Sequence, residues 1–277
     1  MKAEKIKQLE KICSDVRYLT IDAIGRLGVG HLGGCMSIVE ILVVLYWIWM
    51  NVIPNDPKKE GRDRLILSKG HAGPALYATL ALKGFFDKEE LVTTLNALHT
   101  RFPSHADMNR TPGIDMTTGS LGQGFSCAVG AAIGSRLKRD GATIYTIIGD
   151  GESNEGLVWE AAMFAGNQKL NHLIAFTDYN GMQLDGETKD INDLEPLVAK
   201  WEAFGWNACT IPGHDIAEID RVIEQAKNSA NGKPSMIILK TLKGKGVSFL
   251  EANWRNNHNV VIAPEQHQTA LKELGGH

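Results

Sequence analysis

The second half of the chain alternates short apolar segments with longer amphipathic ones, and this alternation restricts the fold more than any other feature. The predicted strands are 143–148, 172–177, 206–211 and 235–241, and the predicted helices between them are 155–168, 194–204 and 216–230. Strands joined by helices of this length pair in parallel and carry helices on both faces. We therefore predict an α/β fold with a doubly wound, mostly parallel sheet.

The first half contains similar segments in a less regular order. Its predicted elements are helices over 4–24, 37–50, 75–83, 88–98 and 124–138, a short strand over 64–68 and a loop over 101–116. We find no internal repeat and no linker rich in Pro, Gly or Ser in the sequence. These observations predict one domain over residues 1–277.

The most apolar stretch is IVEILVVLYWIWM at 38–50, and it contains Glu40. A membrane-spanning helix needs about 20 apolar residues, so this stretch is too short to be expected in a membrane. A helix of this composition instead favours burial, either in the core of the domain or in a subunit interface. The sequence alone leaves these two alternatives open.

Charge and cysteine content exclude several classes of protein. Lys and Arg number 29 and Asp and Glu number 32, so the net charge of −3 gives no reason to expect a nucleic-acid partner. The four cysteines form no C-x-x-C pair, which excludes the usual zinc and dithiol motifs. Free thiols and a charged amino-terminal segment without signal-peptide character predict a cytoplasmic protein.

The glycine pattern Gly28-x-Gly30-x-x-Gly33 resembles a dinucleotide-binding fingerprint only superficially. Such a fingerprint follows a strand, and an acidic residue comes about 20 positions later. Here a predicted helix precedes the glycines and Glu40 comes too early. We therefore expect no nicotinamide cofactor.

Two polar turns follow neighbouring predicted strands. Gly149-Asp150-Gly151 ends one strand, 28 residues (152 to 179) follow, and Asn180 then ends the next strand. Because the carboxyl ends of parallel strands share one edge of a sheet, Asp150 and Asn180 should meet there. Mg²⁺ is normally held by a few protein oxygens together with phosphate and water. Gly151 would let a diphosphate approach the backbone, whereas either turn alone could be an ordinary solvated turn.

This spacing resembles the thiamine diphosphate signature, and the whole chain resembles the N-terminal half of a transketolase. The motifs that carry the resemblance occur in the family's order. They are GHLGG at 30–34, DRLILSKGHA at 63–72, a histidine at 105, TTGSLGQG at 117–124, GDGESNEG at 149–156, DYNGMQLDG at 178–186 and KTLKGKGVSFLE at 240–251.

The resemblance implies a cofactor site with thiamine diphosphate and Mg²⁺, for which Ca²⁺ or Mn²⁺ can substitute. The metal ligands would be Asp150, Asn180 and the carbonyl of Met182. The cofactor-binding residues would be His71, Gly119, Ser120, Leu121, Gly151, Asn180 and His258. In such enzymes the cofactor carries the carbon chemistry, and the protein binds and orients it.

The resemblance also implies catalytic and substrate-binding residues. His31, His105 and His258 would line the sugar channel, where a histidine can both accept and donate a proton near neutral pH. Glu155 stands where the family has a glutamate that links the two active sites of a dimer. Family members often read Trp-His-Gly around the third histidine, whereas this chain has Asn257 and Asn259 on either side of it.

These implications together predict the N-terminal subunit of a two-chain transketolase. It would transfer a two-carbon ketol (glycolaldehyde) unit from a ketose, such as a sugar phosphate or a similar terminally anionic sugar, to an aldose. The family's pyrimidine-binding domain has no counterpart up to His277, so a separate C-terminal subunit is expected, with the pair forming an α₂β₂ heterotetramer.

Two alternatives remain at this point. The chain could serve another thiamine diphosphate enzyme that acts on pyruvate or a 2-oxo acid, such as deoxyxylulose-phosphate synthase or the first component of a 2-oxo acid dehydrogenase. It could also be a non-catalytic subunit that has kept the binding module. The three predicted channel histidines argue against the first alternative, and the intact Asp150, Asn180 and His31 argue against the second.

Overall fold

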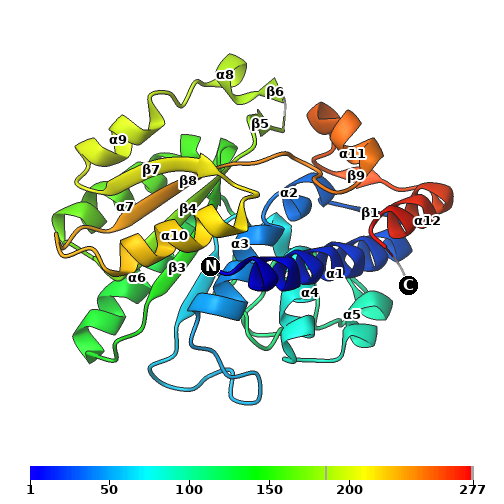
Figure 1. The fold of residues 1–277 in the computed structure, drawn as a ribbon, viewed down its shortest axis with the longest axis horizontal. Helices are drawn as coiled ribbons and strands as arrows, with labels where there is room; N and C mark the ends of the chain where they lie inside the picture. Colours follow the sequence, from blue (N-terminus) through cyan, green and yellow to red (C-terminus); the bar gives the residue numbers. More distant parts are fainter. Residues whose placement is uncertain (185, 276–277) are drawn as a thin grey trace.

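Five strands form one sheet in the computed structural model, which describes residues 1–184 and 186–275. Their spatial order is β2–β3–β4–β8–β7, and every neighbouring pair is parallel (Figure 1). The strands are β2 (Arg64–Leu67), β3 (Ile144–Gly149), β4 (Leu173–Tyr179), β8 (Ser235–Lys240) and β7 (Asn207–Pro212). The predicted parallel α/β sheet is confirmed, whereas the predicted domain end at residue 277 lies outside the described residues.

Alternate residues of the strands face two separate apolar cores, one on each side of the sheet. Tyr145 and Ile147 of β3 belong to one core, and Ile144 and Ile148 belong to the other. This period of two is the pattern expected of a strand buried on both faces. Each core therefore fixes one layer of helices against the sheet.

The first layer contains α1 (Ala3–Leu27), α3 (Val39–Val44), α4 (Gly73–Lys83) and α10 (Ile216–Lys227), and the second contains α6 (Gln123–Lys138), α7 (Gly156–Asn167) and α9 (Leu197–Ala203). Shorter helical segments and small pairs of strands complete the fold. They are β1 (Val29–Gly30), α2 (Leu32–Met36), η1 (Leu45–Trp49), η2 (Gly70–Ala72), α5 (Lys88–Thr94), η3 (Gly151–Asn154), β5 (Met182–Gln183), β6 (Gly186–Glu187), α8 (Thr188–Ile191), α11 (Ser248–Ala252), η4 (Trp254–Asn256), β9 (Val260–Val261) and α12 (Pro264–Glu273).

The predicted helix over 37–50 is confirmed over 39–49, where α3 continues directly into the π-helical turn η1. A break at Ser37 and Ile38 separates it from α2, which was not predicted. At the break, the Ser37 hydroxyl donates to the Asp178 carboxylate at 2.7 Å, and the backbone of Ile38 leaves the helical region. A side-chain bond of this kind competes with helix continuity. Residues 39–46 are buried within the chain itself, so core burial is confirmed for them.

The predicted helix over 88–98 is too long. It ends at Thr94, because Asn96 and His99 adopt positive φ values of 56° and 61°. Left-handed backbone of this kind cannot continue a right-handed helix. The loop that follows carries His105 toward the carboxyl ends of the strands.

Two small antiparallel pairs were not predicted. The β1–β9 pair places Gly30 opposite Val260, and the β5–β6 pair places Met182 opposite Glu187. The first pair brings two segments that are far apart in sequence to one side of the sheet edge. It therefore sets the loops of His31 and His258 side by side.

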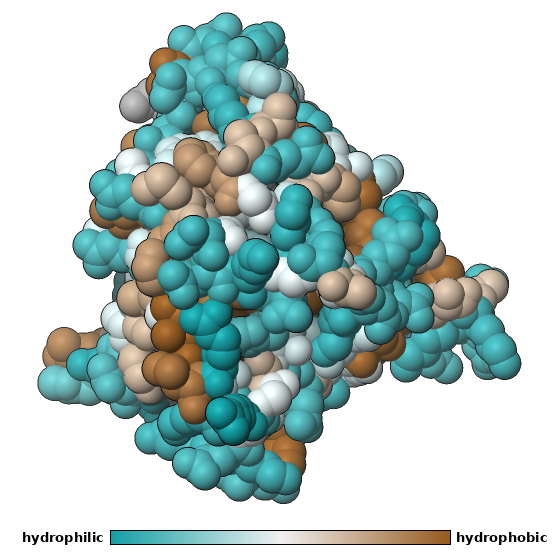
Figure 2. All heavy atoms as spheres, turned by 90° about the vertical axis from the view of Figure 1, so that its left-hand side faces the viewer, coloured by the Kyte–Doolittle hydropathy of each residue, from teal (hydrophilic) through white to brown (hydrophobic). Residues whose placement is uncertain are grey.

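The other side of the molecule, where the strands begin, is shown in Figure 2. Hydrophilic side chains cover most of it, and the apolar ones form narrow strips between them. All four cysteines lie among the described residues as free thiols. None of the described helices has the length and apolar character needed to cross a membrane.

Candidate active site

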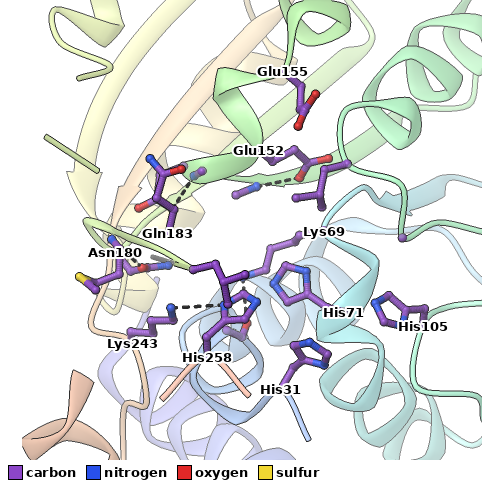
Figure 3. Close-up of a pocket in the computed structure, with 18 residues that line it drawn as sticks. His31, Lys69, His71, His105, Glu152, Glu155, Asn180, Gln183, Lys243 and His258 are labelled. Atoms are coloured by element: carbon purple, nitrogen blue, oxygen red, sulfur yellow. Dashed lines mark hydrogen bonds between the residues drawn. The ribbon is translucent and has the colours of Figure 1, made fainter. Parts of the chain in front are cut away.

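A cavity of about 330 Å³ lies at the carboxyl ends of β2, β3 and β4 (Figure 3). Parallel sheets of this kind bind ligands at this edge. The side chains around the cavity form two groups. We call Asp150, Glu152, Asn180 and Gln183 the oxygen wall, and His31, Lys69, His71, His105, Lys243 and His258 the nitrogen wall.

Asp150 is the central carboxylate of the oxygen wall. It follows β3, and its two oxygens accept hydrogen bonds from the backbone N–H groups of Gly151 at 2.8 Å and Gly181 at 2.7 Å. Burial, together with repulsion from the nearby Asp178, raises the pKa of Asp150 to about 6. A cation bound beside this carboxylate would reverse that effect and keep it ionised.

Asn180 lies beside Asp150 and is held by two hydrogen bonds. Its side-chain N–H donates to Asp178 at 3.2 Å, and its side-chain oxygen accepts from the backbone N–H of Met182 at 3.2 Å. Met182 lines the same cavity. The β3 and β4 turns thus bring together the two predicted side-chain ligands, as their spacing in the sequence indicates.

The donor set tests which metal could fit. The described residues contain no group of three or more His, Cys, Asp or Glu side chains placed to hold a metal ion. The predicted ligand positions instead offer one buried carboxylate, from Asp150, one amide oxygen, from Asn180, and the backbone carbonyl of Met182. Hard oxygens in small number fit Mg²⁺ when phosphate oxygens complete its coordination, so the residues present fit the implied ion.

Glu152 was missed by sequence reasoning. It is buried, and its oxygens accept from the Ser68 hydroxyl, from the N–H of Gly122 at 2.8 Å and from the N–H of Gly149 at 3.0 Å. These bonds connect the loops that follow β2 and β3 with the start of α6. A glutamate two residues after Asp150 gives no recognisable signal in the sequence, because turns commonly contain acidic residues.

Four histidines face one another in the nitrogen wall. The His31 ring lies 5.4 Å from His71, 5.5 Å from His105 and 5.2 Å from His258, measured between ring centroids. The rings of His71 and His258 are 5.0 Å apart. Four segments of the chain therefore converge on one small region.

Burial is the main reason why the pKa values of these four histidines are low. It lowers the pKa of His31, His71 and His105, and burial with the Lys243 charge lowers that of His258 to about 4. The rings are therefore neutral at pH 7. A neutral imidazole has one nitrogen that donates and one that accepts, which suits it to contacts with sugar hydroxyls.

Two lysines of the nitrogen wall were also missed. Lys69 is buried, and its ammonium donates to the Asp178 carboxylate at 2.6 Å and to the Gly34 carbonyl at 2.9 Å. The Lys243 nitrogen lies 3.4 Å from Nδ1 of His258. Burial and the charge of Lys69 lower the pKa of Lys243 to about 8. Both lysines lie in motifs that carry the family resemblance, but an isolated lysine in a sequence is usually a surface residue.

Glycine at two positions keeps room for a ligand. A Cβ atom at Gly34 would lie 3.1 Å from the Lys69 nitrogen and 3.3 Å from Nε2 of His71, at the floor of the cavity. A Cβ atom at Gly151 would lie 2.7 Å from Cβ of Gln183. A side chain at Gly34 would therefore crowd Lys69 and His71, and one at Gly151 would displace Gln183.

The structure places most of the predicted site residues around this one cavity. Those that line it are His31, His71, His105, Gly119, Leu121, Asp150, Gly151, Glu155, Asn180, Met182 and His258. Ser120 does not line it, although its two neighbours do. His258 lies among the other histidines despite its unusual asparagine neighbours.

The sequence is similar to one protein family and to several curated relatives. The family described as "Transketolase, thiamine diphosphate binding domain" matches residues 8–277. The 6-deoxy-6-sulfo-D-fructose transketolase subunit of Clostridium sp. (strain MSTE9) is 57% identical over 98% of both chains. An apulose-4-phosphate transketolase subunit of Phocaeicola vulgatus is 37% identical over 98% of this chain and 95% of its own length.

Single-chain transketolases match over a smaller share of their length. Transketolase of Rattus norvegicus is 36% identical over 90% of this chain but only 39% of its own length. The crystal structure of transketolase from Campylobacter jejuni superposes with a TM-score of 0.90 at 32% identity, covering 99% of this chain and 43% of that one. This chain therefore spans about two fifths of those proteins.

Proposed function

We propose that this chain, which belongs to the transketolase family, is the diphosphate-binding subunit of a two-chain transketolase. As a transketolase-type transferase, the complex moves a two-carbon ketol unit from a ketose to an aldose. The observation that carries the proposal is the cavity in which the oxygen wall of Asp150 and Asn180 faces two lysines and four histidines. In this proposal residues 1–277 act as one domain.

The oxygen wall would hold the metal, and both walls would hold the diphosphate. Asp150, Asn180 and the Met182 carbonyl are the proposed ligands of Mg²⁺. The backbone at Gly151 and the side chains of His71 and Lys243 would contact the diphosphate, because a cation and N–H donors suit an anion. When bound, thiamine diphosphate supplies the nucleophilic carbon needed to break a carbon–carbon bond beside a ketone.

The histidines of the nitrogen wall would handle the sugar's protons. Cleavage of a ketose requires that one hydroxyl lose a proton, and addition to an aldehyde requires that the new hydroxyl gain one. His31, His105 and His258 are neutral and face the same space, so one ring nitrogen can accept a proton and later return it. The low pKa values favour rapid release of that proton.

The sugar donor in this proposal is 6-deoxy-6-sulfo-D-fructose, which would leave a four-carbon sulfo-aldose after transfer. The identity of 57% over 98% of both chains to a subunit named for this sugar supports the choice. Subunits named for apulose 4-phosphate are 37% and 39% identical. We therefore propose a sugar with a terminal sulfonate, rather than one with a terminal phosphate, as the preferred donor.

A separate C-terminal subunit would complete the site, in an α₂β₂ assembly. The relatives named as subunits match this chain over nearly their whole length. Leu184, which lines the cavity, is 67% exposed, and α7 exposes Met163 and Phe164. Solvent-exposed apolar side chains of this kind are typical of surfaces that contact a partner protein. Glu155 lies exposed at the same cavity, where it could reach a second subunit's site.

The test is turnover by the purified pair of subunits with thiamine diphosphate and Mg²⁺. We expect the sulfo-aldose product from 6-deoxy-6-sulfo-D-fructose and an aldose acceptor, at a higher kcat/KM than from fructose 6-phosphate. Carbon dioxide release from pyruvate without ketose turnover would instead indicate a decarboxylating enzyme. Unchanged activity after Asp150→Ala would indicate a non-catalytic subunit.

A further inference from the structure

Asn257 is buried directly before His258 and bonds to three segments of the chain. Its side-chain N–H groups donate to the carbonyls of Lys243 at 3.0 Å and Leu250 at 2.9 Å. Its own carbonyl accepts from the backbone N–H of Gly33 at 2.9 Å. Two of these segments, and Asn257's own, supply members of the nitrogen wall.

The same segments fit closely around the Asn257 side chain. The Gly244 N–H donates to the Gly33 carbonyl at 3.1 Å, which joins the two glycine-bearing loops directly. A Cβ atom at Gly33 would lie 2.2 Å from Oδ1 of Asn257, and one at Gly244 would lie 2.6 Å from its Nδ2. Any side chain at Gly33 or Gly244 would therefore overlap with the Asn257 side chain that lies between them.

Packing alone does not account for an asparagine here. Its Oδ1 atom is buried and has no hydrogen-bond partner among residues 1–184 and 186–275. A buried acceptor without a partner destabilises the folded state, and an apolar side chain of similar volume would avoid that cost. What asparagine adds is the pair of donated bonds that connect the loops.

We propose that Asn257 is a positioning residue that holds Lys243 and His258 against His31 in the geometry needed for the cofactor and the sugar. The Lys243 nitrogen lies 3.4 Å from His258, and the His258 ring lies 5.2 Å from His31, so a shift of either loop moves all three. Small displacements of binding groups reduce affinity and rate strongly. This inference rests on the proposed function.

The experiment compares Asn257→Asp and Asn257→Leu with unaltered protein, all assembled with the partner subunit. The aspartate has the same shape but sets an oxygen against the two carbonyls, and the leucine fills the space without bonding. Asn256→Ala is the matched control, because Asn256 is exposed and, among the described residues, its side chain bonds only to that of Asn253.

We expect both Asn257 variants to raise the Kd for thiamine diphosphate with Mg²⁺ and the KM for the ketose by about tenfold or more, as loss of a supporting contact usually does. The kcat at saturation should change less than the KM. A purely structural role would lower the unfolding temperature and leave the Kd and KM of the folded protein unchanged, and that result would overturn the inference.

Amide hydrogen exchange provides a readout that needs no cofactor. In both variants the N–H groups of Gly33 and Gly244 should exchange faster, whereas those of β4 should not change. If the unaltered pair binds no thiamine diphosphate, the proposed function fails and the positioning role fails with it. If the unaltered pair binds and the variants bind equally well, only the role of Asn257 is refuted.

Discussion

The two walls of the cavity are built in different ways. Asp150, Glu152, Asn180 and Gln183 of the oxygen wall come from the turns after two adjacent strands, β3 and β4. The nitrogen wall is assembled from loops as distant in sequence as His31 and His258. Sheet geometry therefore places Asp150 and Asn180 of the first wall, whereas loop-to-loop bonds must place His31 and His258 of the second. Single substitutions should therefore displace the side chains of the oxygen wall little and those of the nitrogen wall more.

One ion pair lies between the walls. The ammonium of Lys69, from the loop after β2, contacts the Asp178 carboxylate at the end of β4. Although burial alone would raise it, the pKa of Asp178 is lowered by the Lys69 charge and by hydrogen bonds from Lys69, Thr241 and Ser37. Because Asp178 also accepts from Asn180, this pair links the placement of both walls.

The largest effect should come from breaking that link. Lys69→Met leaves a buried carboxylate without its cation, and we expect a loss of about 3–5 kcal/mol in the free energy of unfolding. Urea denaturation, monitored by circular dichroism, measures this loss in the free energy of unfolding. Lys138→Met is the control, since its exposed ammonium lies 3.9 Å from the exposed carboxylate of Glu60 and contributes little. A loss below about 1 kcal/mol for Lys69→Met would show that the pair is not what joins the walls.

Removing the central carboxylate tests the oxygen wall alone. Asp150→Ala should weaken binding of thiamine diphosphate with Mg²⁺ about a thousandfold, as loss of a buried charged partner does. The fold should survive, because burial already disfavours the ionised form of Asp150. Calorimetry on the assembled pair measures the loss, with exposed Asp190→Asn as control. Binding within tenfold of the unaltered protein would remove Asp150 from the metal site.

Histidine variants test whether the nitrogen wall is divided between sugar and cofactor. His31→Ala and His105→Ala should each lower kcat/KM for the ketose about a hundredfold, because a positioned acid–base group contributes on that scale. Cofactor affinity should stay within about twofold, whereas His71→Ala should weaken it. Steady-state kinetics and calorimetry on the same samples separate the two effects. Equal loss of cofactor affinity in all three variants would contradict this division.

The smallest predicted effect concerns pH. With a pKa of about 8, Lys243 is mostly charged at pH 7 and loses its proton as the pH rises. A bound diphosphate favours the charged form, so affinity should be level between about pH 7 and 8 and should then fall by up to about tenfold per unit as the pH rises further. Lys243→Met should bind about tenfold more weakly at pH 7 and lose this slope. A slope that persists in the variant would assign the titration to another group.

The contrast between the walls also explains what the sequence could predict. The strands and long helices follow from apolar periodicity, and Asp150 and Asn180 follow from their positions after adjacent strands. The break at Ser37 and the early end of α5 depend on a side-chain bond and on left-handed backbone, which no local pattern indicates.

His31, His105 and His258 of the nitrogen wall could be predicted only through family resemblance, because they meet through tertiary contacts between loops. Lys69 and Lys243 were overlooked because burial, which makes them unusual, is not visible in sequence. Glu152 was overlooked because its three bonds join distant loops. Asn257 shows the same limit, since its contacts with Gly33, Lys243 and Leu250 span most of the chain.

The central claim is that both walls together bind a metal diphosphate and that a second subunit completes the site. Calorimetric titration of thiamine diphosphate, with Mg²⁺ or with a chelator, tests it directly on this chain alone and mixed with its partner. We predict that only the mixture with Mg²⁺ binds thiamine diphosphate tightly. The same mixture should not bind thiamine that lacks the diphosphate. Tight binding to the lone chain, or binding that ignores Mg²⁺ and the diphosphate, would contradict the account.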